Sequence, residues 1–469
     1  MAIDKHFSSQ QRISLNSSTT PPNIPPGPKH RFLGANASYL FYSDIARYLE
    51  KMWKRYGDFV HLRASGHSMY LINNIQFIEQ ILVKEHKNFT KGTGFQRARL
   101  LLGNGLLTSE GEFHDSQRKM INPAFHRSMI KSYSETVARC TQTMFAQWDK
   151  KIEQYPVLDI EKEMTRLFIA IIMDALFSED SSEELVDTCC EYSDLFHSAN
   201  PLMQLSPETA LKLPLPSVKR FMRVKTTLET MLWQIMKKRK HESVQETFDI
   251  LSIIMKSENP HGGKMSDEEL FDELRTLFVA ANDTSSRVMT WAVYSLSQDP
   301  TILRTAEEEI EQVVGARFPG FEDVEHLSYV KKVMNETMRM YPPVWMMPRT
   351  PIEDFTLGDY PIKKGSSLFI TPFFVHRDER YYPAPEIFDP ERWTDEERRK
   401  RPKMSFIPFG AGPRVCIGEA FSMYHLVVIM AAICQQYQFE LAPEQRVDIT
   451  ARITLKPTYG MNMILRKKR

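Results

Sequence analysis

The longest helical pattern in the sequence starts at the segment SDEE, residues 266–269. Ser266 followed three residues later by Glu269 predicts a capping box, which marks the start of a helix. The pattern continues to about Ser297, and Pro300 ends it, which gives roughly 32 residues or ~48 Å at 1.5 Å per residue. The apolar residues recur at helical spacing: Leu270, Leu274, Leu277, Phe278 and Ala281. A helix of this length crosses the body of the protein, so the fold is expected to be built around it.

The middle of this helix contains the polar segment AANDTSS, residues 280–286. Asn, Asp, Thr and Ser are poor helix formers, and their side chains compete for backbone hydrogen bonds. Two interpretations stay open from the residues alone. The segment is either a solvated turn on an exposed face or a buried part of the helix that opens locally.

The remaining patterns predict a mainly α fold with a minor β portion. The alternating residues 57–74 turn at Ser65-Gly66 and predict a β-hairpin. A helix is expected over about 326–340, ending at Pro342-Pro343, and another after Cys416. Residues 388–393 read as a compact loop, and alternating patterns predict strands after the prolines and near the end of the chain.

The bulk composition excludes several classes of protein. The 60 Lys and Arg residues nearly balance 59 Asp and Glu residues, and no basic repeat is present, so no nucleic-acid partner is expected. Five cysteines in 469 residues do not resemble a disulfide framework and favour a reducing, cytoplasmic compartment. Residues 1–29 predict a flexible polar arm, and the length of the chain alone would suggest two or three domains. No apolar run approaches the ~20 residues of a membrane span, so a soluble protein without an anchor is expected.

The segment FIPFGAGPRVCIGEAF, residues 406–421, contains a lone cysteine, Cys416. A position just before a helix lowers the pKa of a thiol and favours the thiolate, which acts as a nucleophile or a metal ligand. No histidine in the segment supplies a base, and no further ligands at short spacing suggest zinc. A catalytic cysteine with a distant base and an inert buried cysteine remain alternatives.

The neighbours of Cys416 favour a flat ligand that carries carboxylates and accepts one axial thiolate. Glycines allow backbone to pass close to such a ligand, and Arg414 can pair with a carboxylate. Phe409 can shield the sulfur from water. Haem meets this description, and Cys thiolate is one of its known axial ligands. The glycines are Gly410, Gly412 and Gly418.

The sequence resembles the cytochrome P-450 family over about residues 30–469. FGAGPRVCIG fills the family's haem signature, Phe-x-x-Gly-x-Arg-x-Cys-x-Gly. ETMR matches the Glu-x-x-Arg of the family's K helix, PERW resembles its Pro-Glu-Arg-Phe loop, and AANDTS resembles the oxygen-activation segment of its I helix. The resemblance implies one compact domain with haem b between the long central helix and the cysteine loop with the helix after it.

The resemblance also implies roles for particular residues around the haem. Cys416 would be the axial ligand of the haem iron, and Glu336, Arg339 and Arg392 would form a buried charge triad that braces the cysteine loop. The residues expected to contact the haem are Cys416, Arg414, Arg349, His114, Arg118, Phe409, Gly410 and Gly418. Within this set His114 and Arg118 stand where relatives have a Trp-x-x-x-Arg pair, and a solvated surface histidine is the alternative for His114.

Asp283 and Thr284 match the family's acid–alcohol pair, which delivers protons during oxygen activation. The resemblance implies a local opening of the helix here, which Ala281 would narrow because relatives often have glycine at that place. Apolar residues are expected to face the substrate, which should then be apolar as well. They come from Phe278 to Ala280, from Val344 to Met347, including Trp345, and from the loop before residue 105.

The predicted function is that of a haem-thiolate monooxygenase that inserts one atom of O2 into a small apolar substrate. The N-terminal half of this sequence resembles the branch of the family that includes fatty-acid hydroxylases. A fatty acid or a terpenoid is the expected substrate. The chain ends at 469 without a flavin domain, so electrons from NAD(P)H should arrive through a ferredoxin or flavodoxin and its reductase. Basic residues 118, 119 and 398–403 suit an acidic partner, and a monomer is expected. A haem-binding sensor or electron carrier and a haem-free thiol enzyme are the alternatives.

Overall fold

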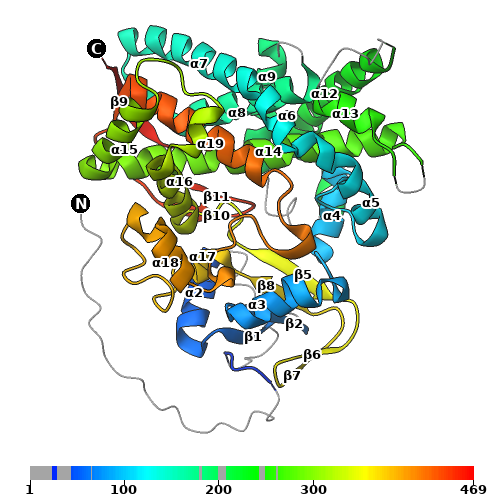
Figure 1. Ribbon diagram of the computed structural model, residues 1–469. Helices are drawn as coiled ribbons and strands as arrows, with labels where there is room; N and C mark the ends of the chain where they lie inside the picture. Colours follow the sequence, from blue (N-terminus) through cyan, green and yellow to red (C-terminus); the bar gives the residue numbers. More distant parts are fainter. Residues whose placement is uncertain are drawn as a thin grey trace.

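The computed structural model describes residues 24–28, 44–64, 66–178, 182–198, 207–241, 249–259 and 262–468. The fold is mainly helical with a minor β portion, as predicted (Figure 1). The arm predicted over residues 1–29 lies outside the described residues except for 24–28. There the backbone carbonyl of Pro26 accepts a hydrogen bond of 2.9 Å from the amide of His61 on strand β1.

The long central helix, α14 (Asp267–Gln298), confirms the sequence prediction. Its capping box is complete, because the Ser266 amide donates to Glu269 Oε2 at 2.7 Å and the Glu269 amide donates to Ser266 Oγ at 3.2 Å. Helix α15 begins directly after it at Pro300. Figure 1 shows α14 running through the helical part of the molecule, with α8 and α19 packed along it.

The other α-helices surround α14 or cover the sheet. Those that precede it in the chain are α2 (Ile45–Tyr56), α3 (Ile75–Glu79), α4 (Thr93–Leu102), α5 (Gly111–Ile121), α6 (Arg127–Ser132), α7 (Ser134–Gln154), α8 (Ile160–Phe177), α9 (Glu183–Ser198), α11 (Pro207–Leu211), α12 (Pro216–His241) and α13 (Ile250–Lys256). Those that follow it are α15 (Pro300–Val313), α16 (Ser328–Met340), α17 (Pro372–Val375), α18 (Asp395–Lys400) and α19 (Glu419–Gln436). The helices predicted near 326–340 and after Cys416 are therefore confirmed as α16 and α19.

Short 3₁₀ and π segments connect these helices. The π-helix is η1 (Gln80–Lys84), and the 3₁₀ turns are η2 (His86–Asn88), η3 (Asn122–Phe125), η4 (Glu322–Glu325), η5 (Pro390–Trp393), η6 (Lys403–Ser405) and η7 (Gly412–Arg414). The compact loop predicted at 388–393 contains η5, and η7 lies in the cysteine loop.

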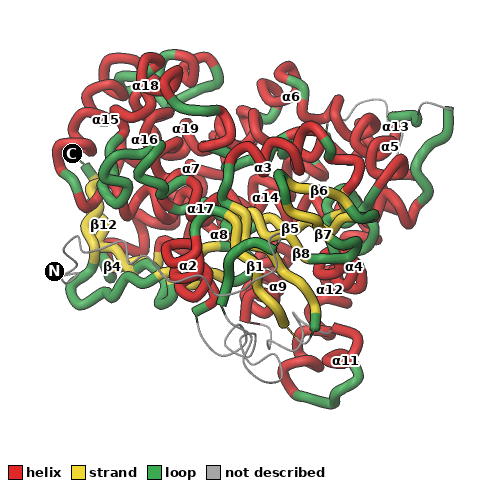
Figure 2. Tube along the Cα trace, turned by 90° about the horizontal axis from the view of Figure 1, so that it is seen from below, coloured by secondary structure: helices red, strands yellow, loops and turns green. Residues whose placement is uncertain are grey.

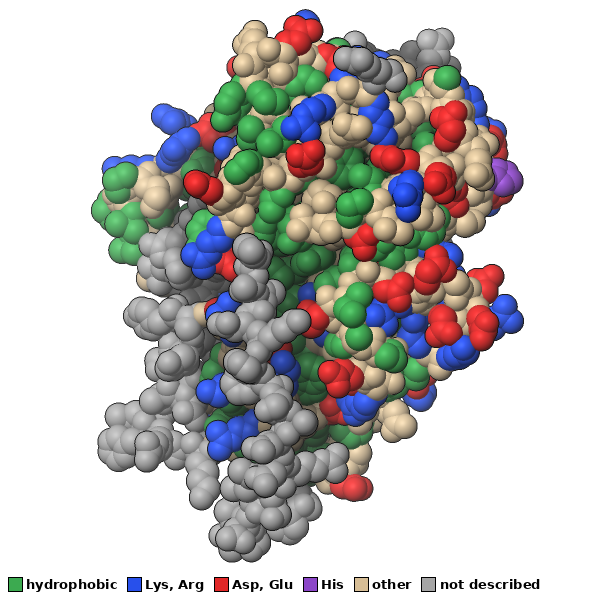
Figure 3. All heavy atoms as spheres, turned by 90° about the vertical axis from the view of Figure 1, so that its left-hand side faces the viewer, with side chains coloured by type: hydrophobic (Ala, Val, Ile, Leu, Met, Phe, Trp, Pro, Cys, Tyr) green, Lys and Arg blue, Asp and Glu red, His purple; other side chains and the backbone are tan. Residues whose placement is uncertain are grey.

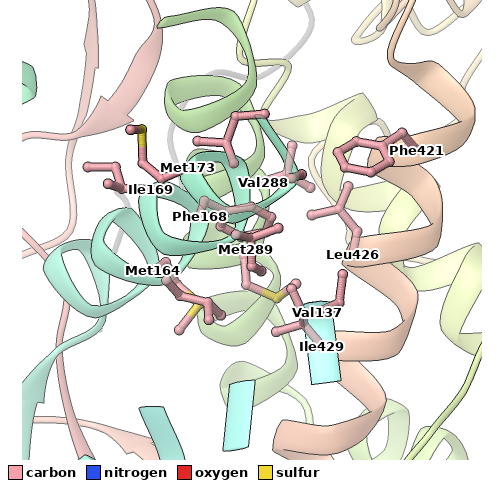
Figure 4. Close-up of a cluster of buried hydrophobic side chains, with 14 of the residues drawn as sticks. Val137, Met164, Phe168, Ile169, Met173, Val288, Met289, Phe421, Leu426 and Ile429 are labelled. Carbon is pink, nitrogen blue, oxygen red and sulfur yellow. The ribbon is translucent and has the colours of Figure 1, made fainter. Parts of the chain in front are cut away.

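The main apolar core lies where α7, α8, α14 and α19 meet. Figure 4 shows Phe168 and Met289 side by side at its centre, with Val137 and Ile429 nearby. Burying one such side chain contributes roughly 1.5–3 kcal/mol, so this cluster holds α14 and α19 in fixed positions. Helix α19 is apolar around most of its circumference, which explains why it lies inside the protein.

The principal sheet has five strands in the order β1-β2-β8-β5-β3. The predicted hairpin is confirmed, because β1 and β2 pair antiparallel with Ala64 opposite His67. Strand β2 pairs parallel with β8, and the β5–β8 and β3–β5 pairs are antiparallel. The strands are β1 (Phe59–Ala64), β2 (His67–Ile72), β3 (Phe89–Thr90), β5 (Met347–Pro351) and β8 (Ser367–Ile370).

Three smaller sheets complete the β portion of the described residues, and Figure 2 shows one of them, with β4 and β12, apart from the main sheet. Their orders are β4-β12-β9, β10-β11 and β6-β7. The strands are β4 (Val157–Asp159), β6 (Phe355–Leu357), β7 (Tyr360–Ile362), β9 (Tyr437–Leu441), β10 (Ile449–Ala451), β11 (Leu455–Pro457) and β12 (Asn462–Lys467). The strands predicted near the end of the chain are therefore present.

Candidate active site

The cysteine loop connects η6 to α19, and Cys416 lies three residues before the first residue of α19. Its backbone amide donates to the Phe409 carbonyl at 2.9 Å, which closes the loop. The Cys416 side chain keeps accessible surface, although protein atoms approach it from several sides. Ser285 on α14 and Ser422 on α19 are 2.9 Å apart through their hydroxyl oxygens, so the loop is held beside the central helix.

Two glycines of the loop adopt left-handed backbone conformations, Gly410 at φ 77° and Gly412 at φ 70°. A Cβ on Gly412 would lie 2.0 Å from the Leu82 carbonyl oxygen in η1. A Cβ on Gly418 would meet nothing closer than 3.9 Å. The sequence interpretation that all three glycines admit a flat ligand is therefore wrong for Gly412, whose close neighbour is protein backbone. The conformation of Gly410 remains the strained one that glycine tolerates.

The ionisation of Cys416 also differs from the expectation. Burial raises the pKa of the Cys416 thiol, while the Gly418 amide and the Arg118 guanidinium act in the opposite direction. The position before α19 is therefore not sufficient to produce a thiolate. A bound metal ion removes the thiol proton directly, so the sulfur is suited to be a ligand rather than a free nucleophile.

A group of half-buried cations lies beside the cysteine loop. Arg414 donates to the Ser109 carbonyl at 2.9 Å and to Glu110 Oε2 at 2.6 Å. Arg349 extends from β5, and burial followed by the charge of Arg414 lowers its pKa to about 10. The structure thus brings together two of the predicted carboxylate-binding arginines from segments 65 residues apart in the chain.

Lys91 belongs to the same cluster, and the sequence motifs did not identify it. Its ammonium group donates to the Leu107 carbonyl at 2.6 Å, and its amide donates to Glu110 Oε1 at 2.6 Å. Burial, followed by the charges of Arg414 and Arg349, lowers the pKa of Lys91 to about 7. The segment FTKGTGF carries no signal that would have marked this lysine.

The charges of this cluster fit haem. Glu110 accepts a hydrogen bond from the Arg414 guanidinium and one from the Lys91 backbone amide, and its charge also acts on the side chains of Lys91 and Arg349. Burial is the main cause that lowers the pKa values of the three cations, and the charge of Arg414 adds to it for Lys91 and Arg349. Further carboxylates nearby would stabilise the charged forms. Haem brings two carboxylates and an iron that accepts a thiolate, so the residues present match both of its needs.

His114 and Arg118 lie on α5, close to this cluster. The His114 side chain is almost fully buried, so the alternative of a solvated surface histidine is excluded. Its Nδ1 lies 3.1 Å from Asp115 Oδ1, and burial followed by the charge of Arg414 lowers its pKa to about 4. Arg118 interacts with the charge of Cys416 and is half-buried. The charge of Arg414 acts on His114 and that of Cys416 on Arg118, and the contact of both residues with haem stays a prediction.

The predicted charge triad is present and buried. Glu336 accepts from Arg339 through two hydrogen bonds of 2.8 Å, and both side chains are 0% exposed. Arg392 Nε lies 3.4 Å from Glu336 Oε1, and the Trp393 indole donates to Glu336 Oε2 at 2.9 Å. Trp393 packs on Phe406 at 4.3 Å between ring centres, so the triad is linked to the start of the cysteine loop.

Thr284 and Asp283 lie in the middle of α14, and the segment around them is helical without interruption. The Thr284 hydroxyl donates to the Ala280 carbonyl at 2.8 Å, which lets it stay in the helix without displacing an amide. Asp283 is buried, so the solvated turn is excluded, and the expected local opening is not observed. Asp283 Oδ1 lies 3.1 Å from Arg287 one helical turn later.

The residues expected to face the substrate divide into two groups. Phe278 and Val279 line a small cavity together with Leu101 and Leu102 of α4 and residues of α9 and α12. Trp345 does not belong to this region, because it is buried in a separate apolar cluster beneath the sheet. Its indole donates to the Arg452 carbonyl at 2.7 Å, and this partner holds the ring in the core.

Comparison with known proteins identifies the family. The cytochrome P-450 family model matches residues 25–463. Cyclooctatin synthase of Streptomyces melanosporofaciens is 30% identical over 402 residues, which cover 85% of this chain and 87% of the relative. Cyclooctat-9-en-7-ol 5-monooxygenase of the same organism is 30% identical over 390 residues, 83% of this chain and 84% of the relative. Pentalenene oxygenase of Streptomyces avermitilis is 26% identical over 400 residues, 85% and 88% of the two chains.

The chain therefore belongs to the cytochrome P-450 family and is a monooxygenase, an oxidoreductase whose cofactor is haem. Enzymes of this family consume O2 and receive electrons from redox partners. Among the helices in the described part of the chain, none is long and apolar enough to cross a membrane.

Proposed function

We propose that Cys416 is the axial ligand of a haem b whose propionates bind Arg414, Arg349 and Lys91. His114 and Arg118 complete this surrounding from α5. The observation that carries the proposal is the excess of half-buried cations beside the Cys416 thiol, because this combination matches the two features of haem at once. Phe409, Gly410 and Gly418 shape the loop around the sulfur.

The bound haem supplies the redox chemistry that activates O2. The reaction converts a C–H bond and O2 into an alcohol and water, with two electrons from the redox partner and two protons from solvent; epoxidation of a double bond has the same balance. Thr284 Oγ1 holds a proton on the substrate side, and Asp283 returns a proton to Thr284 after it has been used. The apolar residues near Phe278 exclude bulk water and orient the substrate.

The proposed substrate is an apolar cyclic terpenoid. Two relatives are named for an oxygenation of cyclooctat-9-en-7-ol and of pentalenene, and both align with more than four fifths of this chain. Phe278, Val279, Leu101 and Leu102 present apolar side chains to a small cavity, which the charged side chains of Lys225, Glu229 and Arg275 also line. The apolar side chains support an apolar substrate. A fatty acid is the second candidate, but no relative compared above carries a name that refers to one.

The proposed source of electrons is NAD(P)H, delivered by a ferredoxin or flavodoxin with its reductase to a monomeric enzyme in the cytoplasm. Arg118, Lys119 and the basic residues 398–403 support an acidic partner. The five cysteines are free thiols, which suits a reducing compartment.

The test is the absorption spectrum of the reduced, haem-loaded protein with carbon monoxide, followed by a screen of cyclic terpenes. A strongly red-shifted Soret band is expected for the wild type, with loss of that band in Cys416→Ser and retention in the control Cys140→Ser. Cyclic terpenes are expected to shift the ferric spectrum and to yield hydroxylated or epoxidised products with a reconstituted electron-transfer chain. A shift without product would favour a haem-binding sensor or carrier, and a protein that takes up no haem would refute the proposal.

A further inference from the structure

Charged side chains form one wall of the small cavity beside Phe278. Lys225 and Glu229 extend from α12 and Arg275 from α14, and all three line the cavity. We call these three residues the polar wall. Their side chains are 11%, 24% and 18% exposed. Figure 3 shows the contrasting arrangement on another face of the molecule, where acidic and basic side chains lie interspersed at the surface. Charges that are withdrawn from water lose hydration, so the polar wall is costly unless its charges are paired.

The charges of the polar wall are paired with one another. Lys225 Nζ donates to Glu229 Oε1 at 2.6 Å, and Arg275 Nη1 donates to the same oxygen at 2.5 Å. The other end of the Arg275 guanidinium group contacts Asp272 one turn earlier in α14. Asp272 also accepts from the Asn104 amide at 2.6 Å. Two cations thus face two carboxylates, and a ligand that brought a further charge would find no opposite charge left for it.

The pairing does not use all the hydrogen-bonding capacity of the polar wall. An ammonium group carries three N–H donors, and the bond to Glu229 uses one of those of Lys225. Within the described part of the chain, both hydrogen bonds to the Glu229 carboxylate go to Oε1, so Oε2 is left as an acceptor. The Arg275 Nε atom is buried and has no partner among these residues. The polar wall therefore offers donors and an acceptor side by side.

The opposite side of the cavity is aromatic and apolar. The Tyr192 ring of α9 stacks on Phe221 at 5.6 Å between ring centres and lies 6.4 Å from the Phe278 ring. Burial, followed by the charge of Glu229, raises the pKa of the Tyr192 hydroxyl, which therefore stays protonated at neutral pH. The cavity is small, so it admits one end of a ligand rather than a complete ring system.

We propose that the polar wall binds a hydroxyl group of the substrate, and that Lys225 and Glu229 determine specificity for a terpenoid alcohol. This inference rests on the proposed function, which assigns the cavity beside Phe278 to the substrate. The hydroxyl oxygen accepts a hydrogen bond from Lys225 Nζ, and the hydroxyl proton is donated to Glu229 Oε2. A hydroxyl group makes both bonds without adding a charge. A hydrocarbon makes neither bond, and a carboxylate brings an uncompensated negative charge.

The place of the polar wall also determines which end of the substrate is oxidised. Arg275 and Thr284 are nine residues apart on α14, which is ~14 Å along the helix axis. The hydroxyl group of the substrate is bound there and is not altered. The C–H bond that is converted therefore belongs to the other end of the carbon skeleton, and the product is a diol whose two oxygen atoms lie far apart.

The test compares three diterpenes on the haem-loaded wild type. Abietadiene, abietadienol and abietic acid share one ring skeleton and differ in a methyl, a hydroxymethyl or a carboxyl group at the same carbon. Their dissociation constants are measured from the shift of the ferric absorption spectrum and, without reference to haem, by isothermal titration calorimetry. We expect abietadienol to bind about tenfold tighter than abietadiene, because a hydrogen bond to a charged group typically contributes this much or more. Abietic acid, as its carboxylate, should bind more weakly than the alcohol.

The variant Lys225→Met removes the donor and keeps an unbranched side chain of similar length. Glu229 keeps its bond to Arg275 in this variant. The affinity for abietadienol should fall about tenfold, to that of abietadiene, while the affinity for abietadiene stays the same. The matched control is Lys219→Met, because Lys219 is exposed on the same helix and does not line the cavity. An unchanged carbon monoxide band and unfolding midpoint in both variants separates lost recognition from lost structure.

The wild-type series decides the question even when Lys225→Met does not fold. Equal affinities for the hydrocarbon and the alcohol would overturn the inference. Tightest binding of abietic acid would also overturn it, because the polar wall would then act as a cationic site. An equal loss of alcohol binding in the two lysine variants would show a general effect of lost charge. A haem-loaded wild type that binds none of the three diterpenes would refute the proposed terpenoid substrate, and the inference with it.

Discussion

Loss of the Glu336 carboxylate should destabilise the protein more than loss of any surface carboxylate. Glu336 accepts two hydrogen bonds from Arg339, one from the Trp393 indole and one of 2.9 Å from the Asp389 amide. In Glu336→Gln the shape is kept, but the amide nitrogen faces donors and the negative charge is gone. Arg339 would then be a fully buried cation with only carbonyl partners, those of His376 at 3.0 Å and Ile387 at 3.2 Å.

The expected cost is about 3–5 kcal/mol, the usual range for breaking a buried ion pair by removing one partner. This is a large part of the ~5–15 kcal/mol by which a domain is normally stable. Glu336 also holds η5 through the Asp389 amide and Trp393, and Trp393 packs on Phe406 next to the cysteine loop. The variant should therefore bind less haem as well as unfold more easily.

The matched control is Glu391→Gln in the same loop. Glu391 is exposed and pairs with Lys332 at 3.0 Å, so its loss should cost only ~0–1 kcal/mol. The assay is urea unfolding of both haem-loaded variants by circular dichroism, together with the ratio of haem to protein absorbance after purification. Equal unfolding midpoints and equal haem content in the two variants would refute the reasoning from burial.

Three further changes test other parts of the site. Gly412→Ala should lower stability by more than the ~1–2 kcal/mol of left-handed strain, because its Cβ would collide with the backbone of η1. Gly365→Ala has the same kind of backbone strain, at φ 79°, but its Cβ would have no neighbour within 4 Å. The difference in unfolding free energy between the Gly412→Ala and Gly365→Ala variants therefore measures the collision with η1. Lys91→Met should speed transfer of haem to a haem-binding acceptor protein, whereas exposed Lys87→Met should not. Burial raises the pKa of Glu273 to about 8 from its ordinary 4.5, so the folded state keeps a proton that the unfolded state has lost between these values. Wild-type stability should therefore fall across this interval relative to Glu273→Gln, as measured by unfolding at pH 5 and pH 8.

Each of these expectations can fail clearly. Equal losses in the two glycine variants would mean that η1 moves away at little cost. Equal rates of haem transfer in the two lysine variants would place Lys91 outside the propionate site. Parallel pH profiles of wild type and the glutamine variant would show that Glu273 loses its proton at the same pH in the folded and unfolded states.

The sequence by itself determined the features that depend on neighbouring residues. The capping box at Ser266 and the apolar periodicity after it placed α14 correctly, because a helix is built from contacts three and four residues apart. The turn at Ser65-Gly66 and the motif around Cys416 are equally local. The pairing of Glu336 with Arg339 was visible as well, since they occupy one face of a helix. That this pair is buried was implied only by the family resemblance.

The tertiary structure decided everything that joins distant segments. Glu110 meets Arg414 across 304 positions of the chain, and no local pattern announces that contact or the presence of Lys91 beside it. Position 412 requires glycine because the backbone of η1 lies close to it. Trp345 lies in the core, where its indole N–H donates a hydrogen bond to the Arg452 carbonyl. The tertiary structure also decided that the pKa of the Cys416 thiol is raised, because desolvation depends on every atom packed around the sulfur. Local periodicity fixes which elements form, but packing fixes which side chains they bring together, and that is where the charges of the active site are set.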